Sequence, residues 1–363
     1  MERKMVMHRF QAIRAALPAY GLDAIMLTEE ANRLYATDFP SIGRDGLCLI
    51  TKTNTYYFTD SRYTVAARRS VHDAKITITG GAVGYAELLN EAIAAESLQT
   101  IGFDDAYMTA ADLAAYQAQL HSTLRPASAL MAALRLTKDA AEIDRMTRAQ
   151  RIAEQALTEL LPDIHPGMTE KQVAAMLHYR ILLNGAEKVS FDPIVVSGEN
   201  GAMPHGIPSD KIIGDGDFLT MDFGAMKDGY CSDMTRTYAI GHATDEMRRV
   251  YNTVLAAQTA AIAATKAGMT GREIDGIARN IIADAGFGAY FGHGYGHGLG
   301  IEIHEAPAVS PRNDQPLPAG AVTSAEPGIY IPGKFGVRIE DVVVIQPDGN
   351  INLTQMPKEL TIL

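Results

Sequence analysis

The decisive stretch of the sequence is Asp217-Phe218-Leu219-Thr220-Met221-Asp222-Phe223-Gly224-Ala225, which reads as a β-strand with a carboxylate inside an apolar run. A second strand follows around Cys231-Ser232-Asp233-Met234-Thr235, after the turn candidate Lys227-Asp228-Gly229. A buried carboxylate is costly unless it is paired, hydrogen-bonded or bound to a metal. The two strands therefore predict a hairpin whose aspartates, Asp222 and Asp233, need a partner.

The register of this hairpin depends on its turn. A turn at residues 227 and 228 places Asp222 directly opposite Asp233, whereas a turn at Asp228-Gly229 makes them diagonal neighbours. Either register leaves both side chains on one face, because strand side chains alternate. Like charges that face each other destabilise a sheet, and a cation between them removes the repulsion. The alternative is a pair of solvated aspartates beside a turn.

A third segment, Phe291 to Glu305, contains three histidines within twelve residues: His293, His297 and His304. Glycine occupies every second position from 292 to 300. Such a strand has little side-chain bulk on one face, which suits close approach by a ligand or another backbone. A single histidine is usually structural, but three on a glycine-lined strand favour a site. The segment fits neither a phosphate-binding glycine loop nor the HExxH zinc motif.

Two further carboxylates, Glu326 and Glu340, stand in strand-like apolar surroundings. Either alone could be a satisfied buried acid, with Arg338 as the obvious partner. Together with the earlier residues they form an oxygen-rich set with enough charge for two divalent ions, namely Asp222, Asp233, His297, Glu326 and Glu340.

Outward from this set, the chain divides into two parts. Residues 1–133 form an α/β unit with strands expected at residues 24–27, 47–50, 56–58 and 76–78, followed by a mostly helical segment from Tyr85 to Leu134. Residues 134–142 are polar enough for a linker, and a helix with apolar residues at helical spacing follows. We therefore expect an N-terminal domain of residues 1–133 and a second domain of residues 134–363.

The second part contains a weak internal repeat. Gly167-Met168-Thr169 recurs as Gly268-Met269-Thr270, and the same offset of 101 residues pairs Gly185 with Gly286. In both copies the threonine is placed to cap a helix that ends near the later glycine. One repeat of this length suggests two related halves around a shared site.

Composition narrows the function further. The 363 residues are 47% hydrophobic and 21% charged, as in an ordinary globular protein, and a net charge of −11 without a dense basic block argues against nucleic acid as a partner. No apolar run is long enough to span a membrane. The two cysteines form no CxxC pattern, which favours a reducing compartment, and the expected location is the cytoplasm.

The five candidate ligands resemble, in order, spacing and local context, those of the pita-bread metallopeptidases, and most closely those of prolidases and aminopeptidase P-like Xaa-Pro peptidases. Residues 134–363 resemble the catalytic domain of that family. Residues 1–133 resemble the creatinase/prolidase N-terminal domain, including Tyr57-Phe58-Thr59-Asp60-Ser61-Arg62-Tyr63. The resemblance implies a mixed α/β (α+β) fold, in which a small α/β domain precedes a pseudo-twofold pita-bread catalytic domain. Methionine aminopeptidases share the ligands but lack the first domain.

The resemblance also implies a role for each ligand. Asp222 should chelate one metal, His297 and Glu326 should bind the other, and Asp233 and Glu340 should bridge the two. Four further residues match active-site positions of the family, namely His205 in Pro204-His205-Gly206, His293, His304 and Arg338. In this comparison Glu326 is the proton acceptor, while His205 and His304 position the substrate and stabilise the oxyanion.

The implied activity is dinuclear metal-dependent hydrolysis of the Xaa-Pro bond at the N-terminus of short proline-containing peptides. Manganese is the expected metal, while cobalt, zinc and iron also suit a mixed oxygen and nitrogen site. A homodimer is expected from the family alone. Two alternatives share the fold: a creatinase-like hydrolase or lyase that acts on a non-peptide substrate, and a non-catalytic homologue that binds a partner. The intact set of five ligands argues against both.

Overall fold

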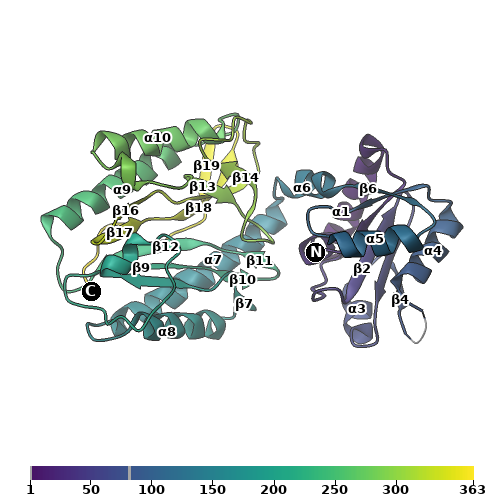
Figure 1. Cartoon of the computed structure of the whole chain (residues 1–363), viewed down its shortest axis with the longest axis horizontal. Helices are drawn as coiled ribbons and strands as arrows, with labels where there is room; N and C mark the ends of the chain where they lie inside the picture. Colours follow the sequence, from purple (N-terminus) through teal and green to yellow (C-terminus); the bar gives the residue numbers. More distant parts are fainter. Residues whose placement is uncertain (1, 81–82) are drawn as a thin grey trace. The chain divides into compact units, whose positions relative to one another are not determined.

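The computed structural model describes residues 2–80 and 83–363, which form two compact units, Met1–Arg135 and Leu136–Leu363 (Figure 1). The connection between them is shorter than the predicted linker of residues 134–142, because helix α6 (Ser128–Arg135) ends at Arg135 and helix α7 (Ala140–Leu160) begins at Ala140. Asp139 accepts hydrogen bonds from Ala141 N and Glu142 N, and Asp139 N donates one to the Glu142 side chain. This capping box starts α7 before the apolar periodicity becomes visible.

The N-terminal unit is built on a six-stranded mixed sheet in the order β4-β3-β2-β1-β5-β6. Its strands are β1 (Ala24–Leu27), β2 (Gly46–Thr51), β3 (Thr55–Thr59), β4 (Lys75–Ile78), β5 (Thr100–Phe103) and β6 (Thr123–Pro126). The first four were predicted. The expectation of a mostly helical segment after Tyr85 was wrong in part, because it missed β5 and β6. Each has only four residues, and they continue the sheet by parallel pairing with β1 and with each other.

Helices surround this sheet. They are α1 (Glu2–Ala16), the 3-10 helix η1 (Leu17–Tyr20), α2 (Glu30–Thr37), α3 (Thr64–Ser70), α4 (Tyr85–Glu96), α5 (Ala110–Gln119) and α6. Leu88 and Leu89 of α4 pack in one apolar cluster with Met26 of β1 and Leu49 of β2. The unit thus has a core of its own.

The C-terminal unit has two pairs of helices with strands between them. Figure 1 shows α9 (Asp245–Ala264) and α10 (Gly271–Asp284) along one side of these strands and α8 (Glu170–Leu183) along the opposite side. One apolar core joins α9 and α10 to the second half of the sheet system, and another joins α7 and α8 to the first half.

The strands of this unit form four small sheets, ordered β11-β10-β7, β12-β9-β8, β14-β13-β15-β18-β19 and β16-β17. In the first half they are β7 (Lys188–Val189), β8 (Ile194–Ser197), β9 (Phe218–Phe223), β10 (Ala225–Lys227), β11 (Tyr230–Cys231) and β12 (Met234–Ala239). In the second half they are β13 (Gly296–Gly298), β14 (Glu305–Val309), β15 (Val322–Ala325), β16 (Gly328–Ile331), β17 (Phe335–Arg338), β18 (Asp341–Gln346) and β19 (Gly349–Asn352).

The internal repeat is confirmed at both helix starts. Thr169 caps α8 and Thr270 caps α10, each with its side-chain oxygen accepting a hydrogen bond from the backbone N–H three residues later. Gly185 and Gly286, just beyond the two helices, have φ angles of 99° and 89°. This left-handed conformation favours glycine, so the repeated glycines have a backbone reason.

The structure also decides the register of the aspartate hairpin. Met226 pairs with Cys231 and Lys227 with Tyr230, so the turn is Asp228-Gly229, with φ angles of 49° and 74°. Asp222 consequently lies opposite Thr235, and Asp233 is its diagonal neighbour.

The glycine-rich segment is less regular than predicted. Only Gly296–Gly298 forms a strand, not the whole run from residue 291. Close approach by another backbone is confirmed: a Cβ atom on Gly296 would lie 2.2 Å from Ser324 O, and one on Gly298 would lie 2.4 Å from Ala306 O. The glycines therefore let neighbouring chain segments converge on His297.

Candidate metal centre

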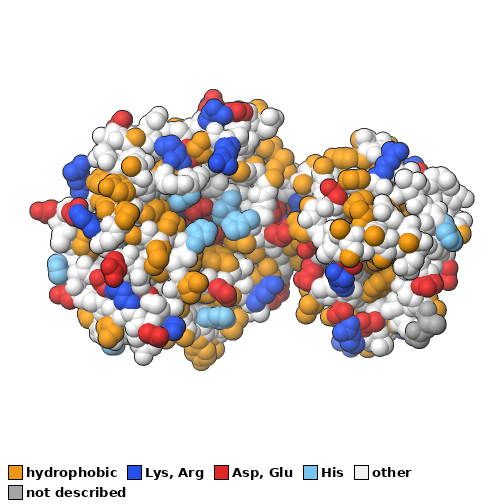
Figure 2. All heavy atoms as spheres, in the orientation of Figure 1, with side chains coloured by type: hydrophobic (Ala, Val, Ile, Leu, Met, Phe, Trp, Pro, Cys, Tyr) orange, Lys and Arg blue, Asp and Glu red, His pale blue; other side chains and the backbone are white. Residues whose placement is uncertain are grey.

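All nine predicted site residues line one cavity of about 470 Å³ in the C-terminal unit. In Figure 2, histidine side chains gather beside acidic ones at a hollow in the face of this unit. A cavity of about 620 Å³ lies within the N-terminal unit, but no histidine lines it, and at its rim Arg44 pairs with Asp112. The smaller cavity is therefore the candidate site.

Three predicted ligands come closest together. One donor atom each from Asp233, His297 and Glu340 lie within 4.8 Å of one another. His297 Nε2 is 3.5 Å from Asp233 Oδ2 and 3.3 Å from Glu326 Oε1, which adds a fourth ligand candidate. Asp222 lines the same cavity.

The ends of strands place these carboxylates. Asp222 lies in β9, Asp233 stands directly before β12, Glu326 follows β15, and Glu340 stands directly before β18. Backbone bonds fix the last two: Glu326 N donates to Tyr295 O at 2.8 Å, and Glu340 N donates to Thr235 O at 3.1 Å.

Among the described residues that line the cavity, two buried carboxylate oxygens have no hydrogen-bond partner, Oδ1 of Asp222 and Oδ1 of Asp233. Native proteins rarely leave buried polar atoms unsatisfied, so each such atom calls for an explanation. The sequence offered Arg338 as a possible partner for Glu326 or Glu340, but its guanidinium bonds to Asp222 instead. Arg338 Nη2 donates to Asp222 Oδ2 at 2.5 Å, while Glu340 Oε2 accepts from Thr235 Oγ1 at 2.7 Å. Arg338 thus satisfies only one oxygen of the unit's acidic cluster.

The electrostatics of the cluster would favour binding of a cation. Burial raises the pKa of Asp233 well above its usual value, and the charges of Asp222 and Glu326 raise it further. Burial, and then the charges of Asp233, Glu326 and Asp222, likewise raise the pKa of Glu340. Divalent cations would relieve this repulsion and give the unpartnered oxygens a ligand, so the donor set fits them.

The imidazole of His297 has the tautomer and the protonation state that suit a metal ligand. Its Nδ1 lies 3.1 Å from Gly298 O, a contact in which Nδ1–H donates, and this leaves the Nε2 lone pair facing Asp233 and Glu326. Burial lowers the pKa of His297, which favours the neutral ring that metal binding requires. His297 N also donates to Ser324 Oγ, whose hydroxyl donates to Glu326 Oε1.

A chain of hydrogen bonds joins Arg338 to His293. Arg338 Nη1 donates to Tyr330 Oη at 2.9 Å, and Tyr330 Oη lies 2.9 Å from His293 Nε2. His293 Nδ1 lies 2.8 Å from Gly294 O, and because Nδ1–H donates there, Nε2 accepts from the tyrosine. Tyr330 was missed in the sequence, where nothing but its position four residues after Glu326 marks it.

The remaining two histidines lie at the exposed side of the cavity. The His304 ring packs edge-on against the His297 ring, with centroids 4.4 Å apart. His205 lies on the long connection between β8 and β9, beside Pro204, whose carbonyl accepts from Arg338 Nη1 at 3.2 Å. Both side chains can reach a ligand without being buried themselves.

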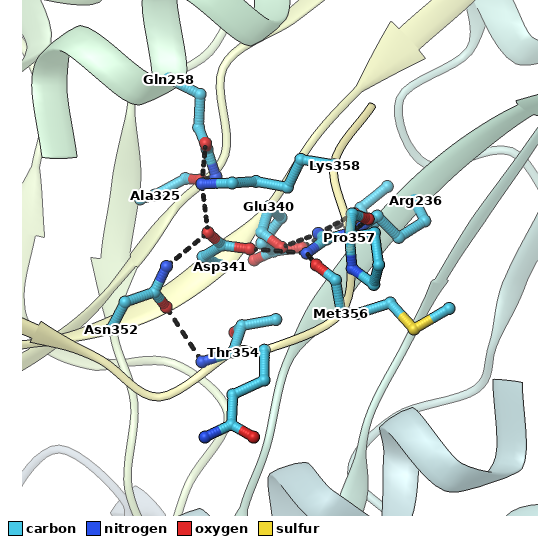
Figure 3. Close-up of polar contacts among 12 residues, drawn as sticks. Arg236, Gln258, Ala325, Glu340, Asp341, Asn352, Thr354, Met356, Pro357 and Lys358 are labelled. Atoms are coloured by element: carbon cyan, nitrogen blue, oxygen red, sulfur yellow. Dashed lines mark hydrogen bonds and ion pairs between the residues drawn. The ribbon is translucent and has the colours of Figure 1, made fainter. Parts of the chain in front are cut away.

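Behind Glu340 lies a polar network that the sequence also did not reveal (Figure 3). All five N–H donors of buried Arg236 are used: they reach the carbonyls of Thr235, Glu340, Met356 and Pro357 and the carboxylate of Asp341. Asp341 also accepts from Lys358 Nζ at 2.8 Å. Although burial opposes it, these two cations lower the pKa of Asp341. The guanidinium thereby ties the backbone of Glu340 to that of Thr235.

Models of two known families match this chain. The model of metallopeptidase family M24 matches residues 144–347, and the creatinase/prolidase N-terminal domain matches residues 9–137. The chain belongs to metallopeptidase family M24.

Relatives of this M24 peptidase share its whole length. An uncharacterized peptidase of Bacillus subtilis is 40% identical over 98% of this chain and 100% of its own. Among solved structures, a Bacillus anthracis protein described as an Xaa-Pro dipeptidase has 40% identity and a TM-score of 0.94, with 99% of this chain and 100% of that chain covered. An X-Pro aminopeptidase from Thermotoga maritima has 36% identity and a TM-score of 0.91, with 98% and 99% covered. No helix among the described residues is long and apolar enough to cross a membrane.

Proposed function

We propose that this M24 peptidase hydrolyses the Xaa-Pro bond at the N-terminus of short peptides with two divalent metal ions. The observation that carries the proposal is the buried cluster of Asp233, His297 and Glu340, with Asp222 and Glu326 lining the same cavity. Two carboxylate oxygens of the cavity have no partner among the described residues, and burial favours the neutral form of the imidazole. Both features suit metal ligands. The names of the structural neighbours support the substrate class.

Each ligand takes a proposed role. Asp222 would hold one ion, His297 and Glu326 the other, and Asp233 and Glu340 both. Bound divalent ions would supply Lewis-acid polarisation of the scissile carbonyl and a water of lowered pKa.

The chain's own groups would do the rest of the chemistry. Glu326 would accept the proton of the attacking water, and burial raises its pKa toward the range useful for this work. His304 and His205, at the exposed side of the cavity, would donate hydrogen bonds to the substrate carbonyl as negative charge develops on it. Arg338 and Tyr330 would keep Asp222 and His293 in place through the bonds described above.

Recognition of proline must rely on shape, because the residue after the scissile bond has no amide N–H to donate. The cavity lining includes three apolar side chains, Phe191, Ile194 and Ile303, which would contact the pyrrolidine ring. The structural neighbour described as an Xaa-Pro dipeptidase supports the expectation of short substrates.

Three finer expectations belong to the same proposal. Manganese is the expected metal, with cobalt, zinc and iron as alternatives that suit the same donors. The expected assembly is a homodimer. Two buried, unpaired cysteines, Cys48 and Cys231, fit a reducing compartment, and the cytoplasm remains the expected location.

The experiment compares kcat/KM for Ala-Pro, Ala-Pro-Ala, acetyl-Ala-Pro-Ala and Ala-Ala, after chelation and after reloading with each of the four metals. We expect no turnover in the metal-free protein, turnover of free Xaa-Pro peptides after reloading, and a slight preference for the dipeptide. Equal cleavage of the acetylated peptide would contradict an exopeptidase. Equal cleavage of Ala-Ala would contradict proline specificity, and full activity without metal would refute the metal centre.

A further inference from the structure

The loop that presents His205 is tied at both ends to one buried carboxylate. Glu170, the first residue of α8, is 0% exposed. Its Oε1 accepts from Ser197 N at 2.6 Å and Ser197 Oγ at 3.0 Å, where the loop begins. Its Oε2 accepts from Ser209 N at 3.0 Å and Ser209 Oγ at 2.6 Å, where the loop ends. Within the loop, Asn200 Nδ2 lies 3.2 Å from each of the two oxygens.

The middle of this loop, residues 198–208, is held from the other side by β17. Arg338 Nη1 donates to Pro204 O, next to His205. Gly201 and Gly336 are in backbone contact, since a Cβ atom on Gly336 would lie 1.9 Å from Gly201 O. His205 is therefore placed between two anchors, Arg338 on the cavity side and Glu170 on the α8 side.

Comparison of the two repeated halves shows that helix α8 does not need a carboxylate at position 170 in order to begin there. At the matching position of α10 the residue is Gly271. The backbone frame is the same in both halves: Lys171 N donates to Ser209 O, and Arg272 N donates to Asn313 O. Bridges between Thr169 and Ile212, and between Thr270 and Pro316, complete the correspondence.

A helix can thus begin and pair with the returning chain in this fold without a carboxylate. Among the described residues, the acid at position 170 binds only donors at the ends of the loop and within it, and Gly271 of the other half has no side chain that could do the same. A carboxylate offers acceptors alone, which suits a site in which every neighbour donates.

We propose that Glu170 is a positioning residue that keeps the His205 loop ordered over the cavity, so that its effect on the reaction passes through His205. This inference rests on the proposed function of His205. Glu170→Gln tests it sharply, because the side chain keeps its size while an NH₂ group replaces one acceptor and faces donors. Glu199→Gln is the matched control, since Glu199 is an exposed carboxylate of the same loop.

The experiment is a double-mutant cycle on the metal-loaded protein, with Ala-Pro as substrate and metal content measured in every variant. Glu170→Gln is expected to lower kcat by roughly 10- to 100-fold with both metals retained, because small misplacements of a positioning group have effects of this size. In a His205→Ala background the same substitution should change kcat by less than about twofold, since coupled residues are not additive. Glu199→Gln should leave kcat unchanged.

A second readout follows the loop itself. Hydrogen exchange of the backbone amides of residues 198–208 should accelerate in Glu170→Gln and not in Glu199→Gln. Should Glu170→Gln fail to fold, Ser209→Ala removes one hydroxyl donor and keeps the carboxylate, and it should show a smaller change of the same kind.

Two results would overturn the proposal: equal effects of Glu170→Gln with and without His205, or unchanged exchange in the loop. A His205→Ala variant with wild-type kcat would instead refute the function proposed for His205, and exchange would still decide whether Glu170 orders the loop.

Discussion

Asp233→Asn should stabilise the metal-free protein and destabilise the metal-loaded one. The substitution keeps the size of the side chain and removes one negative charge from the buried cluster. In the metal-free state that charge is mainly unfavourable: burial and the charges of Asp222 and Glu326 oppose it, and Arg338 offsets them only in part. A donor atom of Asp233 also lies within 4.8 Å of one of Glu340, and its Oδ1 has no partner among the described residues. In the loaded state the same charge would hold the cations.

The magnitude follows from this separation. Two unit charges at most 4.8 Å apart in an effective dielectric constant of about 20 repel by at least about 3.5 kcal/mol. The wild-type protein relieves part of this by keeping a proton, so we expect Asp233→Asn to raise the free energy of unfolding by about 1 to 3 kcal/mol. For a domain of this size the melting temperature should rise by about 2–4 °C per kcal/mol.

The sign of the pH dependence is also defined. Burial and neighbouring carboxylates raise the pKa values of Asp233 and Glu340 in the folded state, so the folded metal-free protein holds protons that the unfolded chain releases. Its stability is therefore complete below the ordinary carboxyl pKa and falls as the pH rises toward and through the raised values. The advantage of Asp233→Asn should be small near pH 4 and should grow toward pH 8.

The assay is calorimetry of chelator-treated protein across this pH range, with and without added manganese. Asp348→Asn is the control, because Asp348 is an exposed carboxylate in the turn between β18 and β19. With saturating metal the order should reverse, since a ligand present at about 1,000 times its Kd stabilises the wild type by about 4 kcal/mol. A metal-free Asp233→Asn protein no more stable than the wild type at pH 8 would refute the reasoning.

Three further outcomes are expected. Arg236→Met should lower the free energy of unfolding by about 3 kcal/mol in urea titrations, because it leaves the Asp341 carboxylate under-compensated, and adding Asp341→Asn should restore part of the loss. An unchanged urea midpoint would contradict the network's role. His304→Ala should lower kcat by about 100-fold with two metals still bound, and loss of metal would instead assign His304 to the ligand set. Light scattering should give twice the chain mass of 39.1 kDa, and a fully active monomer would exclude the dimer.

The sequence indicated those parts of the fold whose signal is local. Strands β1 to β4 are short apolar runs bounded by polar residues, and Thr169 and Thr270 are caps that can be read from neighbouring residues. Strands β5 and β6 carry no comparable signal, because each has only four residues, with Gly102 inside β5 and Pro126 at the end of β6, and parallel pairing with distant strands stabilises them. The sequence predicted the hairpin but left two registers open, because the register depended on which turn residues would take positive φ.

In the candidate site, too, the sequence indicated the residues with a local signal and missed those that depend on long-range contacts. Carboxylates in apolar strands and clustered histidines are unusual enough to be noticed one by one, and the structure brings them into one cavity. The residues that orient them are ordinary in type and distant in sequence: Thr235 lies 105 residues from Glu340, and Glu170 lies 39 residues from Ser209. Nothing in their spacing could have identified these contacts, because only the folded chain brings them together.

The two halves also explain why the acidic ligands occur in pairs. In the order of elements, β9 and β12 of the first half correspond to β15 and β18 of the second. Asp222, the fifth residue from the start of β9, matches Glu326, the fifth from the start of β15. Asp233 directly precedes β12, as Glu340 directly precedes β18.

Each half thus contributes one carboxylate near the end of a strand and one at the start of its partner. The other polar groups break this symmetry. His297 belongs to the second half alone, whereas Glu170 and the His205 loop belong to the first alone, where the second half has Gly271. Duplication therefore accounts for the symmetry of the acidic centre that we propose holds two cations. In the proposed reaction, the direction in which a peptide is bound and cleaved would come from residues without a counterpart in the other half, such as His297 and His304 on one side and His205 with its proposed anchor Glu170 on the other.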